Sequence, residues 1–277
     1  MLGRKREGSV LCPSCGTLVG VNDDQCLNCG RRKPGLFGFA PLLAHFTRGE
    51  IGFAEVITVA CVVLFGLSLV LSVLLPPYRI SMSGLMGFLS PSNEAGFLLG
   101  ASGGFPVRGY GRWWTLFSAS WLHGGLIHIL FNMMWVRQLV PAVQELYGLS
   151  RMVIIYTASG VAGFALSSLM SFNLTLGASA AVFGLLGAMI HYSRRGGSSL
   201  IGQQAKMWAL MLFIFGFMFS GIDNWAHLGG FGGGYLSSMW LDPLKPERGN
   251  HALMAVACLA VTALAIVLSV LTGLQVM

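Results

Sequence analysis

Long apolar runs separated by short polar segments dominate this 277-residue chain. A bilayer core about 30 Å thick needs roughly 20 apolar residues for each helix that crosses it. The pattern predicts seven membrane-spanning helices, at residues 54–75, 114–140, 151–171, 177–193, 206–222, 224–241 and 251–274. The composition agrees, because 55% of the residues are hydrophobic and only 10% are charged, against about 25% charged in soluble domains. We therefore expect an all-α polytopic membrane protein.

The basic residues predict how these helices are oriented. With a cytosolic N-terminus, all but three of the 17 Lys and Arg residues fall in cytosolic segments, the exceptions being Arg79, Arg108 and Arg112. This bias follows the positive-inside rule and puts the C-terminus outside. The first residues also lack the apolar run of a signal peptide. We expect a multi-pass protein of a cell (inner) membrane, whose net charge of +7 reflects topology and implies no nucleic-acid partner.

Four cysteines near the N-terminus follow the pattern of a metal site. They lie in the segments CPSCG and CLNCG, as Cys12, Cys15, Cys26 and Cys29. Two such pairs can place four thiolates around one Zn²⁺, with glycine making the turn after the second sulfur of each pair. Two disulfides, a redox pair or a bound iron are the alternatives, and a reducing cytosol disfavours disulfides. We predict a cytosolic zinc ribbon over residues 1–33, holding structural zinc.

The predicted loop at residues 76–113 is long, rich in proline and aromatic residues, and low in charge. A flexible linker of this length would carry more polar residues. We expect this loop to lie partly in the membrane interface on the outer side.

Polar side chains inside the predicted spans indicate a site, because such groups are costly in a membrane and mark function by default. His128 and Asn132 are four residues apart and share one helix face in the second span. Ser179 and His227 both lie roughly 5 Å below the outer boundary, counted at the helical rise from the starts of their spans. His128 and Asn132 are expected somewhat deeper. Taken singly, each is explained as a packing residue; their shared depth favours catalysis.

Small residues predict that the fourth and sixth spans approach closely. Ala180, Gly184 and Gly187 recur on the fourth span, and Gly230 and Gly234 recur on the His227 face of the sixth. Stripes of small residues allow helix backbones to come together in membranes. Close approach would bring the imidazole of His227 to the hydroxyl of Ser179.

Together, these features resemble the rhomboid family of intramembrane serine proteases. The matching segments, in order, are RWWT at 112–115, HGGLIHILFN at 123–132, GASA at 177–180 and AHLGGFGGG at 226–234. The resemblance covers about residues 50–245. It implies a six-helix core over residues 51–245, preceded by the ribbon and a basic linker at 34–50, and followed by an additional membrane helix within 246–277.

The resemblance also implies roles for single residues. Ser179 would be the nucleophile and His227 the general base. His128, Asn132 and the backbone N–H of Ser179 would form the oxyanion hole. The supporting residues would be Gly177, which holds the turn before Ser179, Arg112 and Trp113, which belong to the outer loop, and Gly230, in the histidine helix. The fifth span would gate lateral access of membrane-protein substrates, and catalysis would need no cofactor.

Several alternatives remain open. A proteolytically inactive relative that binds membrane clients would be expected to lack the serine or the histidine, and both are present. A transporter would carry polar residues through the whole membrane depth. Asp223, four residues before His227, either orients the imidazole or, more simply, caps a turn. Ala180 departs from the family pattern, where glycine commonly follows the serine. The ribbon would cap the chain, regulate it or bind a cytosolic partner.

Overall fold

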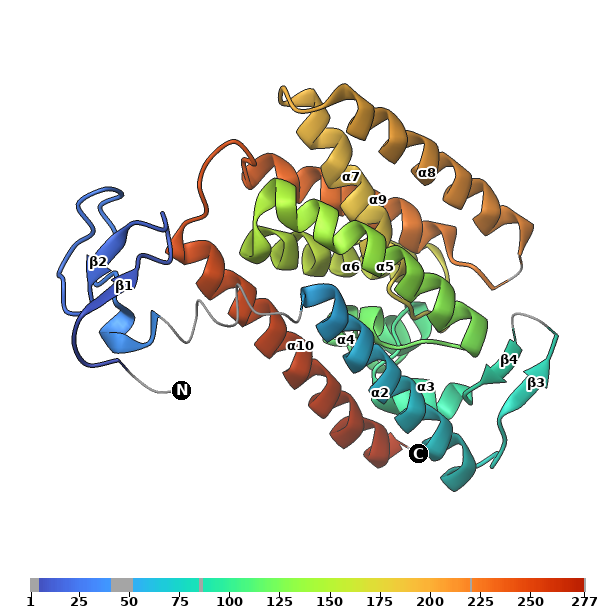
Figure 1. The fold of residues 1–277 in the computed structure, drawn as a ribbon. Coiled ribbons are helices and arrows are strands. Elements are labelled where there is room, and N and C mark those ends of the chain that lie inside the picture. The colour runs from blue at the N-terminus through green and yellow to red at the C-terminus, as the bar shows by residue number, and fades with distance from the viewer. Residues whose placement is uncertain (1–4, 41–51, 85–86, 220, 277) are drawn as a thin grey trace.

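Helices make up most of the structure, a computed structural model that describes residues 5–40, 52–84, 87–219 and 221–276 (Figure 1). Seven long helices correspond to the seven predicted spans: α2 (Phe53–Leu74), α5 (Leu126–Tyr147), α6 (Leu149–Met170), α7 (Ser179–Arg194), α8 (Ser199–Met218), α9 (Asn224–Trp240) and α10 (Gly249–Val276). Residues 41–50 of the predicted linker lie outside the described residues. The fold class predicted from the sequence is confirmed.

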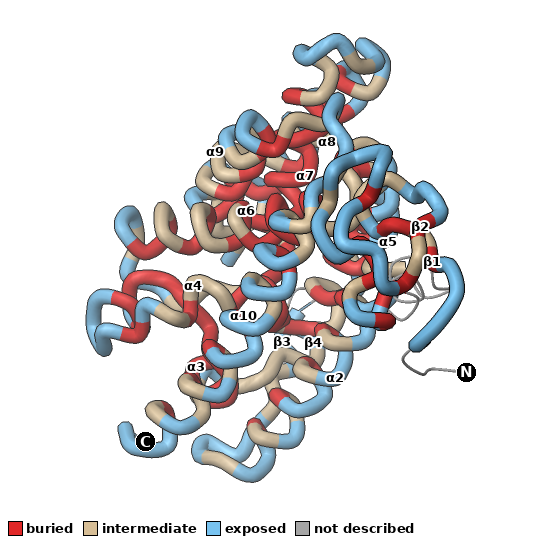
Figure 2. The backbone as a smooth tube through the Cα atoms, turned by 90° about the vertical axis from the view of Figure 1, so that its left-hand side faces the viewer, coloured by how far each residue is buried: buried red, intermediate tan, exposed pale blue. Residues whose placement is uncertain are grey.

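The helices differ in how they meet the membrane. By length and composition, five of them are able to cross it, namely α2, α5, α6, α8 and α10. The other two, α7 and α9, have 16 and 17 residues and pack together with α6 at the centre of the bundle. Buried residues concentrate in α6 and α7, whereas α8 and α10 are largely exposed (Figure 2). Their exposed side chains are mostly apolar, as expected of surfaces that face lipid.

Glycines allow the central helices to approach each other. A Cβ atom at Gly230 of α9 would overlap the carbonyl oxygen of Ala180 in α7, and one at Gly234 would overlap that of Gly184. The predicted close approach of these helices is therefore confirmed. An adjacent face of α9 lies close to α6, where a Cβ atom at Gly233 would lie 2.5 Å from the side chain of Ala162.

The second span begins later than predicted. Residues 114–125 form the short helix α4 (Thr115–Ser118), the 3-10 helix η3 (Ala119–Trp121) and an extended segment, and α5 starts only at Leu126. Gly124 and Gly125 precede that start, and glycine favours helix less than most residues. His128 consequently lies in the first turn of α5 and not deep in a longer helix. A smaller error affects α8, which begins at Ser199 instead of residue 206, because its first turns carry exposed polar residues.

The loop between α2 and α4 contains elements that the hydrophobic pattern did not predict. Strands β3 (Ser81–Ser83) and β4 (Gly87–Ser90) pair antiparallel, and helix α3 (Asn93–Leu99) and the π-helix η2 (Phe105–Gly109) follow. Ser92 caps α3 by accepting a hydrogen bond from the Ala95 N–H at 3.2 Å. Residues Ala95, Leu98 and Leu99 are buried, so the segment is packed and not a flexible linker.

The N-terminal segment forms a small unit beside the start of α10 (Figure 1). Strands β1 (Ser9–Leu11) and β2 (Leu18–Gly20) pair antiparallel with Val10 opposite Val19, and the 3-10 helix η1 (Leu36–Gly38) follows. Both valines are buried with Cys12 and Cys26 in a core separate from that of the helices. A Cβ atom at Gly249 would lie 2.7 Å from the Arg31 guanidinium, so this unit contacts the first residue of α10.

Candidate active site

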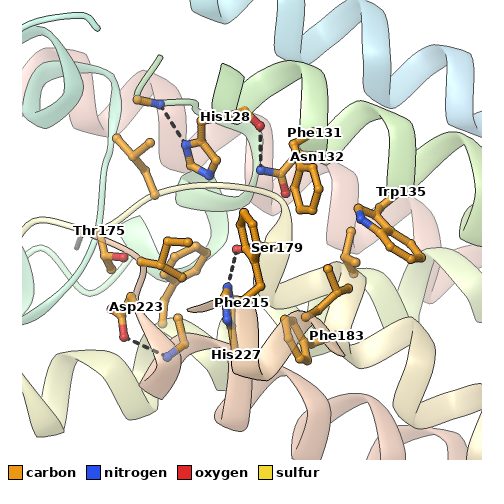
Figure 3. A pocket seen from close by; sticks show the side chains of 18 of the residues that line it. His128, Phe131, Asn132, Trp135, Thr175, Ser179, Phe183, Phe215, Asp223 and His227 are labelled. Atoms are coloured by element: carbon orange, nitrogen blue, oxygen red, sulfur yellow. Dashed lines mark hydrogen bonds between the residues drawn. The ribbon is translucent and has the colours of Figure 1, made fainter. Parts of the chain in front are cut away.

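A cavity of about 330 Å³ opens at the end of the bundle where α5, α7 and α9 begin, hereafter the site end (Figure 3). Its walls come from all three helices, from α8 and from the segment before α7. The polar side chains that line it include Asn93, His128, Asn132, Thr175, Ser179, Asp223 and His227. Four of these are the residues that the sequence singled out, brought together from three helices.

Ser179 and His227 are hydrogen-bonded across this cavity. Ser179 is the first residue of α7, and His227 lies in the first turn of α9. The Ser179 Oγ atom and the His227 Nε2 atom are 3.0 Å apart, and His227 is buried (Figure 3). This is the distance at which an imidazole can accept a hydroxyl proton. Chemically, the pair is an alcohol beside a base.

Asp223 caps α9. Its Oδ1 atom accepts a hydrogen bond from the Ala226 N–H at 3.0 Å, and its Oδ2 atom accepts one from the Ser167 hydroxyl. The simpler interpretation of this residue from the sequence, a capping role, is confirmed. The Nδ1 atom of His227 is buried and has no hydrogen-bond partner among the described residues.

An aromatic ring packs against the face of the His227 imidazole. The ring of Phe183 stacks on the imidazole with centroids 4.3 Å apart and planes 19° from parallel. Sequence reasoning missed this residue, because a phenylalanine in an apolar helix is indistinguishable from core. The only available signal was its spacing, one helical turn after Ser179 on the same helix face.

His128 and Asn132 lie opposite Ser179 in the cavity (Figure 3). The Gly124 N–H donates to His128 Nδ1 at 3.3 Å, so in the neutral ring the proton is on Nε2. That Nε2 atom lies beside the turn before Ser179, since a Cβ atom at Gly177 would be 2.7 Å from it. Asn132 donates one Nδ2 hydrogen to the His128 carbonyl at 2.9 Å, which leaves its second hydrogen available. Both side chains can therefore donate into the cavity.

Ala180 fits where the family pattern has glycine. Its methyl group is fully buried and faces α6 at Gly163, where a Cβ atom would lie 2.7 Å from that of Ala180. The absence of a side chain at Gly163 makes room for the methyl group.

The predicted loop residues Arg112 and Trp113 have different surroundings. Arg112 is 2% exposed, and its guanidinium donates to the carbonyls of Phe97 at 2.7 Å and Ser269 at 2.6 Å. Burial lowers the pKa of Arg112 to about 10, which leaves it charged at neutral pH. The Trp113 side chain is 54% exposed, and the neighbouring Trp114 makes the buried contact, donating to the Ser269 hydroxyl at 3.1 Å.

Aromatic side chains close the cavity between α5 and α8. Phe131 and Phe215 stack with centroids 5.4 Å apart, and Trp135 and Trp208 meet edge to face at 5.4 Å. Phe131, Trp135 and Phe215 also line the cavity. The wall between the cavity and the lipid on this side is thus made of side chains.

The four N-terminal cysteines form a second cluster, far along the chain from the cavity. Their sulfur atoms all lie within 4.8 Å of one another, with Cys12 and Cys29 at 3.7 Å and Cys15 and Cys26 at 3.6 Å. Gly16 and Gly30 follow the two C-x-x-C pairs, each with a φ of 72°, which makes the predicted glycine turns. A tetrahedron of thiolates about 2.3 Å from Zn²⁺ has edges of about 3.8 Å. The cluster is therefore compatible with one tetrahedral metal ion.

Comparisons with known proteins agree with this geometry. Residues 110–243 match the model of the Rhomboid domain. The putative rhomboid protease YdcA of Bacillus subtilis (strain 168) is 34% identical over 145 residues, covering 50% of this chain and 71% of YdcA. The chain belongs to the rhomboid family. Rhomboid protease GluP of the same bacterium is 34% identical over 154 residues, covering 54% of this chain and 30% of GluP.

Plant relatives are also similar to this rhomboid. RHOMBOID-like protein 4 of Arabidopsis thaliana is 36% identical over 141 residues, covering 49% of this chain and 36% of the plant protein. The chain thus spans about a third of the length of this relative and of GluP. The matched domain contains Arg112, His128, Ser179 and His227, whereas the cysteine cluster and α10 of this rhomboid lie outside it.

Proposed function

We propose that this rhomboid is an intramembrane serine protease that cleaves membrane proteins near the outer face of the membrane. The single observation that carries the proposal is the 3.0 Å hydrogen bond between Ser179 and His227 at the cavity. The rhomboid family and its protease-named members support the reaction class. In this proposal Ser179 is the nucleophile and His227 is the general base.

The first half of the reaction forms an acyl-enzyme. His227 Nε2 accepts the Ser179 proton while Oγ attacks the scissile carbonyl carbon, and the carbonyl oxygen becomes an oxyanion. The tetrahedral intermediate collapses as the C–N bond breaks, and the imidazolium gives its proton to the leaving amine. Phe183 keeps the imidazole plane in place during both transfers.

The oxyanion is stabilised by fixed hydrogen-bond donors. We assign this role to the Nε2–H of His128, the free Nδ2–H of Asn132 and the backbone N–H of Ser179. The Ser179 N–H belongs to the first turn of α7, where backbone donors lack an intrahelical partner. Removing one such donor costs about 3–4 kcal/mol of transition-state stabilisation in a comparable hole.

The second half of the reaction consumes water. His227 takes a proton from a water molecule that attacks the ester carbonyl, and the C–O bond to Ser179 breaks as the proton returns to Oγ. The net change is hydrolysis of one peptide bond. Because attack requires an extended backbone, substrates are expected to carry helix-destabilising residues near the cleaved bond.

A proteolytically inactive client-binding protein is the second candidate. It is the weaker one because the serine and the histidine are both present and hydrogen-bonded. A binding role alone would not need an activated hydroxyl.

The deciding experiment compares the unaltered chain with Ser179→Ala in liposomes containing a transmembrane reporter. Ser238→Ala is the matched control, because Ser238 is a buried serine of α9 that does not line the cavity. We expect cleavage by the unaltered chain and the control only, and labelling of Ser179 by a fluorophosphonate probe. Equal cleavage by Ser179→Ala would reject the assigned nucleophile, and the absence of both cleavage and labelling would favour the client-binding function.

We also propose that the four cysteines hold a structural zinc ion in a ribbon over residues 1–33. The sulfur separations and the two glycine turns support this assignment. In the proposed organisation, a basic linker at 34–50 joins the ribbon to the core at 51–245, and a further helix occupies 246–277. The ribbon lies in the cytosol in this arrangement and is available to a cytosolic partner.

A further inference from the structure

Helix α10 lies outside the matched Rhomboid domain, yet it is hydrogen-bonded to Arg112 in the loop between α2 and α4. We propose that Ser269 and Gly273 of α10 are positioning residues for the Ser179–His227 pair. The proposal rests on the proposed protease function, and it makes the seventh helix part of the catalytic unit.

The contact between α10 and the loop is polar and buried. The Arg112 guanidinium donates to the Ser269 carbonyl at 2.6 Å, and the Trp114 indole donates to the Ser269 hydroxyl at 3.1 Å. Arg112 also bonds the Phe97 carbonyl and lies over the Phe97 ring, 4.1 Å from its centroid. Hydrogen bonds to a charged donor are stronger than neutral ones, and a buried guanidinium that loses a partner is costly.

Small residues on α10 make this contact possible. The buried positions of the helix are Ala255, Thr262, Ala265, Ser269 and Gly273, which recur along one face. At the site end, a Cβ atom at Gly273 would lie 2.8 Å from Leu98 Cδ1, and one at Gly100 would lie 2.6 Å from Ser269 Oγ. Larger side chains at Ser269 or Gly273 would therefore push the helix away from the loop.

Hydrogen bonds continue from Arg112 toward the nucleophile. The Arg112 carbonyl accepts from the Thr115 hydroxyl at 2.7 Å, and that hydroxyl lies 3.1 Å from Ser102 Oγ. Ser102 and Thr175 exchange two backbone hydrogen bonds of 2.8 Å each. Thr175 lines the cavity and belongs to the segment that leads directly into Ser179.

A second connection fixes the same segment. The Gly177 N–H donates to the carbonyl of Ala119 at 2.9 Å, and Ala119 begins the 3-10 helix that follows α4. Helix α10 packs against both α3 and α4. The turn before Ser179 is thus hydrogen-bonded to the segments that follow α3 and α4, the two helices against which α10 packs.

The geometry separates positioning from substrate binding. No described residue of α10 lines the cavity, and the aromatic wall at which the family resemblance implies substrate entry lies between α5 and α8. Displacing α10 should therefore misplace Ser179 relative to its base and oxyanion donors without removing a substrate contact. A misplacement of about 1 Å can lower the rate of the chemical step by about 100-fold.

The test measures kcat and KM for a transmembrane reporter in liposomes, the rate of fluorophosphonate labelling of Ser179, and the thermal unfolding midpoint. Ser269→Leu and Gly273→Leu are compared with Ala263→Leu, which places the same leucine side chain at an exposed position of α10. We expect kcat and the labelling rate to fall about 10- to 100-fold in the first two variants, with KM changed by less than about twofold. The Ala263→Leu control should retain both rates.

Two further variants distinguish a loss of positioning from a failure to fold. Leu98→Ala combined with Gly273→Leu removes the side chain that the new leucine would strike, and should recover most of the lost kcat. Gly273→Ala adds one methyl group against the flexible end of Leu98, and should lower kcat less but in the same direction.

Two results would overturn the positioning role. One is a lowered unfolding midpoint with unchanged kcat in the folded variants, and the other is a raised KM with unchanged kcat. If the unaltered chain neither cleaved the reporter nor took up the label, the proposed protease function would fail, and the positioning role with it.

Discussion

At the scale of single residues, the absence of a side chain at Gly177 shapes the candidate site. Gly177 lies two residues before Ser179 with a φ of 133°, a region that favours glycine. Its missing Cβ atom leaves the space in which the Nε2–H of His128 approaches the turn. The same residue thus sets the backbone conformation before the nucleophile and the access of a proposed oxyanion donor.

Gly177→Ala is therefore expected to lower kcat by about 100-fold, since it displaces the His128 donor and strains the turn. The measurement is reporter cleavage at saturating substrate. Gly196→Ala is the matched control, because Gly196 also has a positive φ of 100° but has open space around its missing Cβ. The control should lose about 1–2 kcal/mol of stability and retain kcat. Equal kcat in both variants would argue against the assigned oxyanion hole.

At the scale of elements, α8 differs from its neighbours in how it is held. It packs against α7, makes few contacts with α9, and meets α5 through aromatic side chains. Most of its surface is exposed. A helix attached in this way can move aside at a small cost, which fits the gating role implied by the family resemblance.

Phe215→Ala should raise the cleavage rate of a transmembrane reporter by about 2- to 10-fold, because an aromatic pair contributes about 0.5–1.5 kcal/mol. The rate of fluorophosphonate labelling, which needs no lateral opening, should stay the same. Ile214→Ala, at an exposed position of α8, serves as the control and should change neither rate. A parallel loss of cleavage and labelling in Phe215→Ala would assign Phe215 to the site itself and reject the gate.

At the scale of the whole molecule, charged groups gather at the end of the bundle opposite the site. Asp242 pairs with Arg195 at 3.2 Å and with Lys245 at 3.5 Å. A backbone hydrogen bond from Leu244, together with these two cations, lowers the pKa of Asp242. Arg151 is buried at the same end, with its guanidinium bonded to backbone carbonyls. A cationic end of this kind is expected on the cytosolic side.

Reporter fusions to the two termini test this orientation. We expect a periplasm-dependent reporter to be active when fused after residue 277 and inactive when fused before residue 1, because the basic residues favour a cytosolic N-terminus. The opposite activities would put Ser179 at the cytosolic face and contradict cleavage near the outer face.

Metal analysis tests the ribbon as a separate unit. The purified chain should hold one zinc ion per molecule, and Cys12→Ser should lose it, because the remaining thiolates no longer complete a tetrahedron. Protease sensitivity of residues 5–40 should rise, while reporter cleavage changes by less than about twofold, since the ribbon has its own core. Cys258→Ser, outside the cluster, should retain the metal. An unchanged zinc content in Cys12→Ser would reject the assignment.

Local patterns in the sequence located the seven long helices and singled out four side chains that line the cavity, namely His128, Asn132, Ser179 and His227. Hydrophobic length identified the spans, because lipid leaves a helix few alternatives to satisfying its own backbone. Equal depth singled out Ser179 and His227, and glycine spacing predicted the contact between α7 and α9. The motifs supplied the family resemblance. Each of these signals is contained within one helix or in the comparison of two helix starts.

Tertiary structure alone decided what depends on partners distant in sequence. The stacking of Phe183 on His227 and the bond from Arg112 to Ser269 join residues that lie far apart in the sequence. Arg112 and Ser269 are 157 residues apart, so no periodicity relates them. Packing selects among apolar side chains that look alike in sequence, and it determined which phenylalanine meets the histidine and which helix supports the loop.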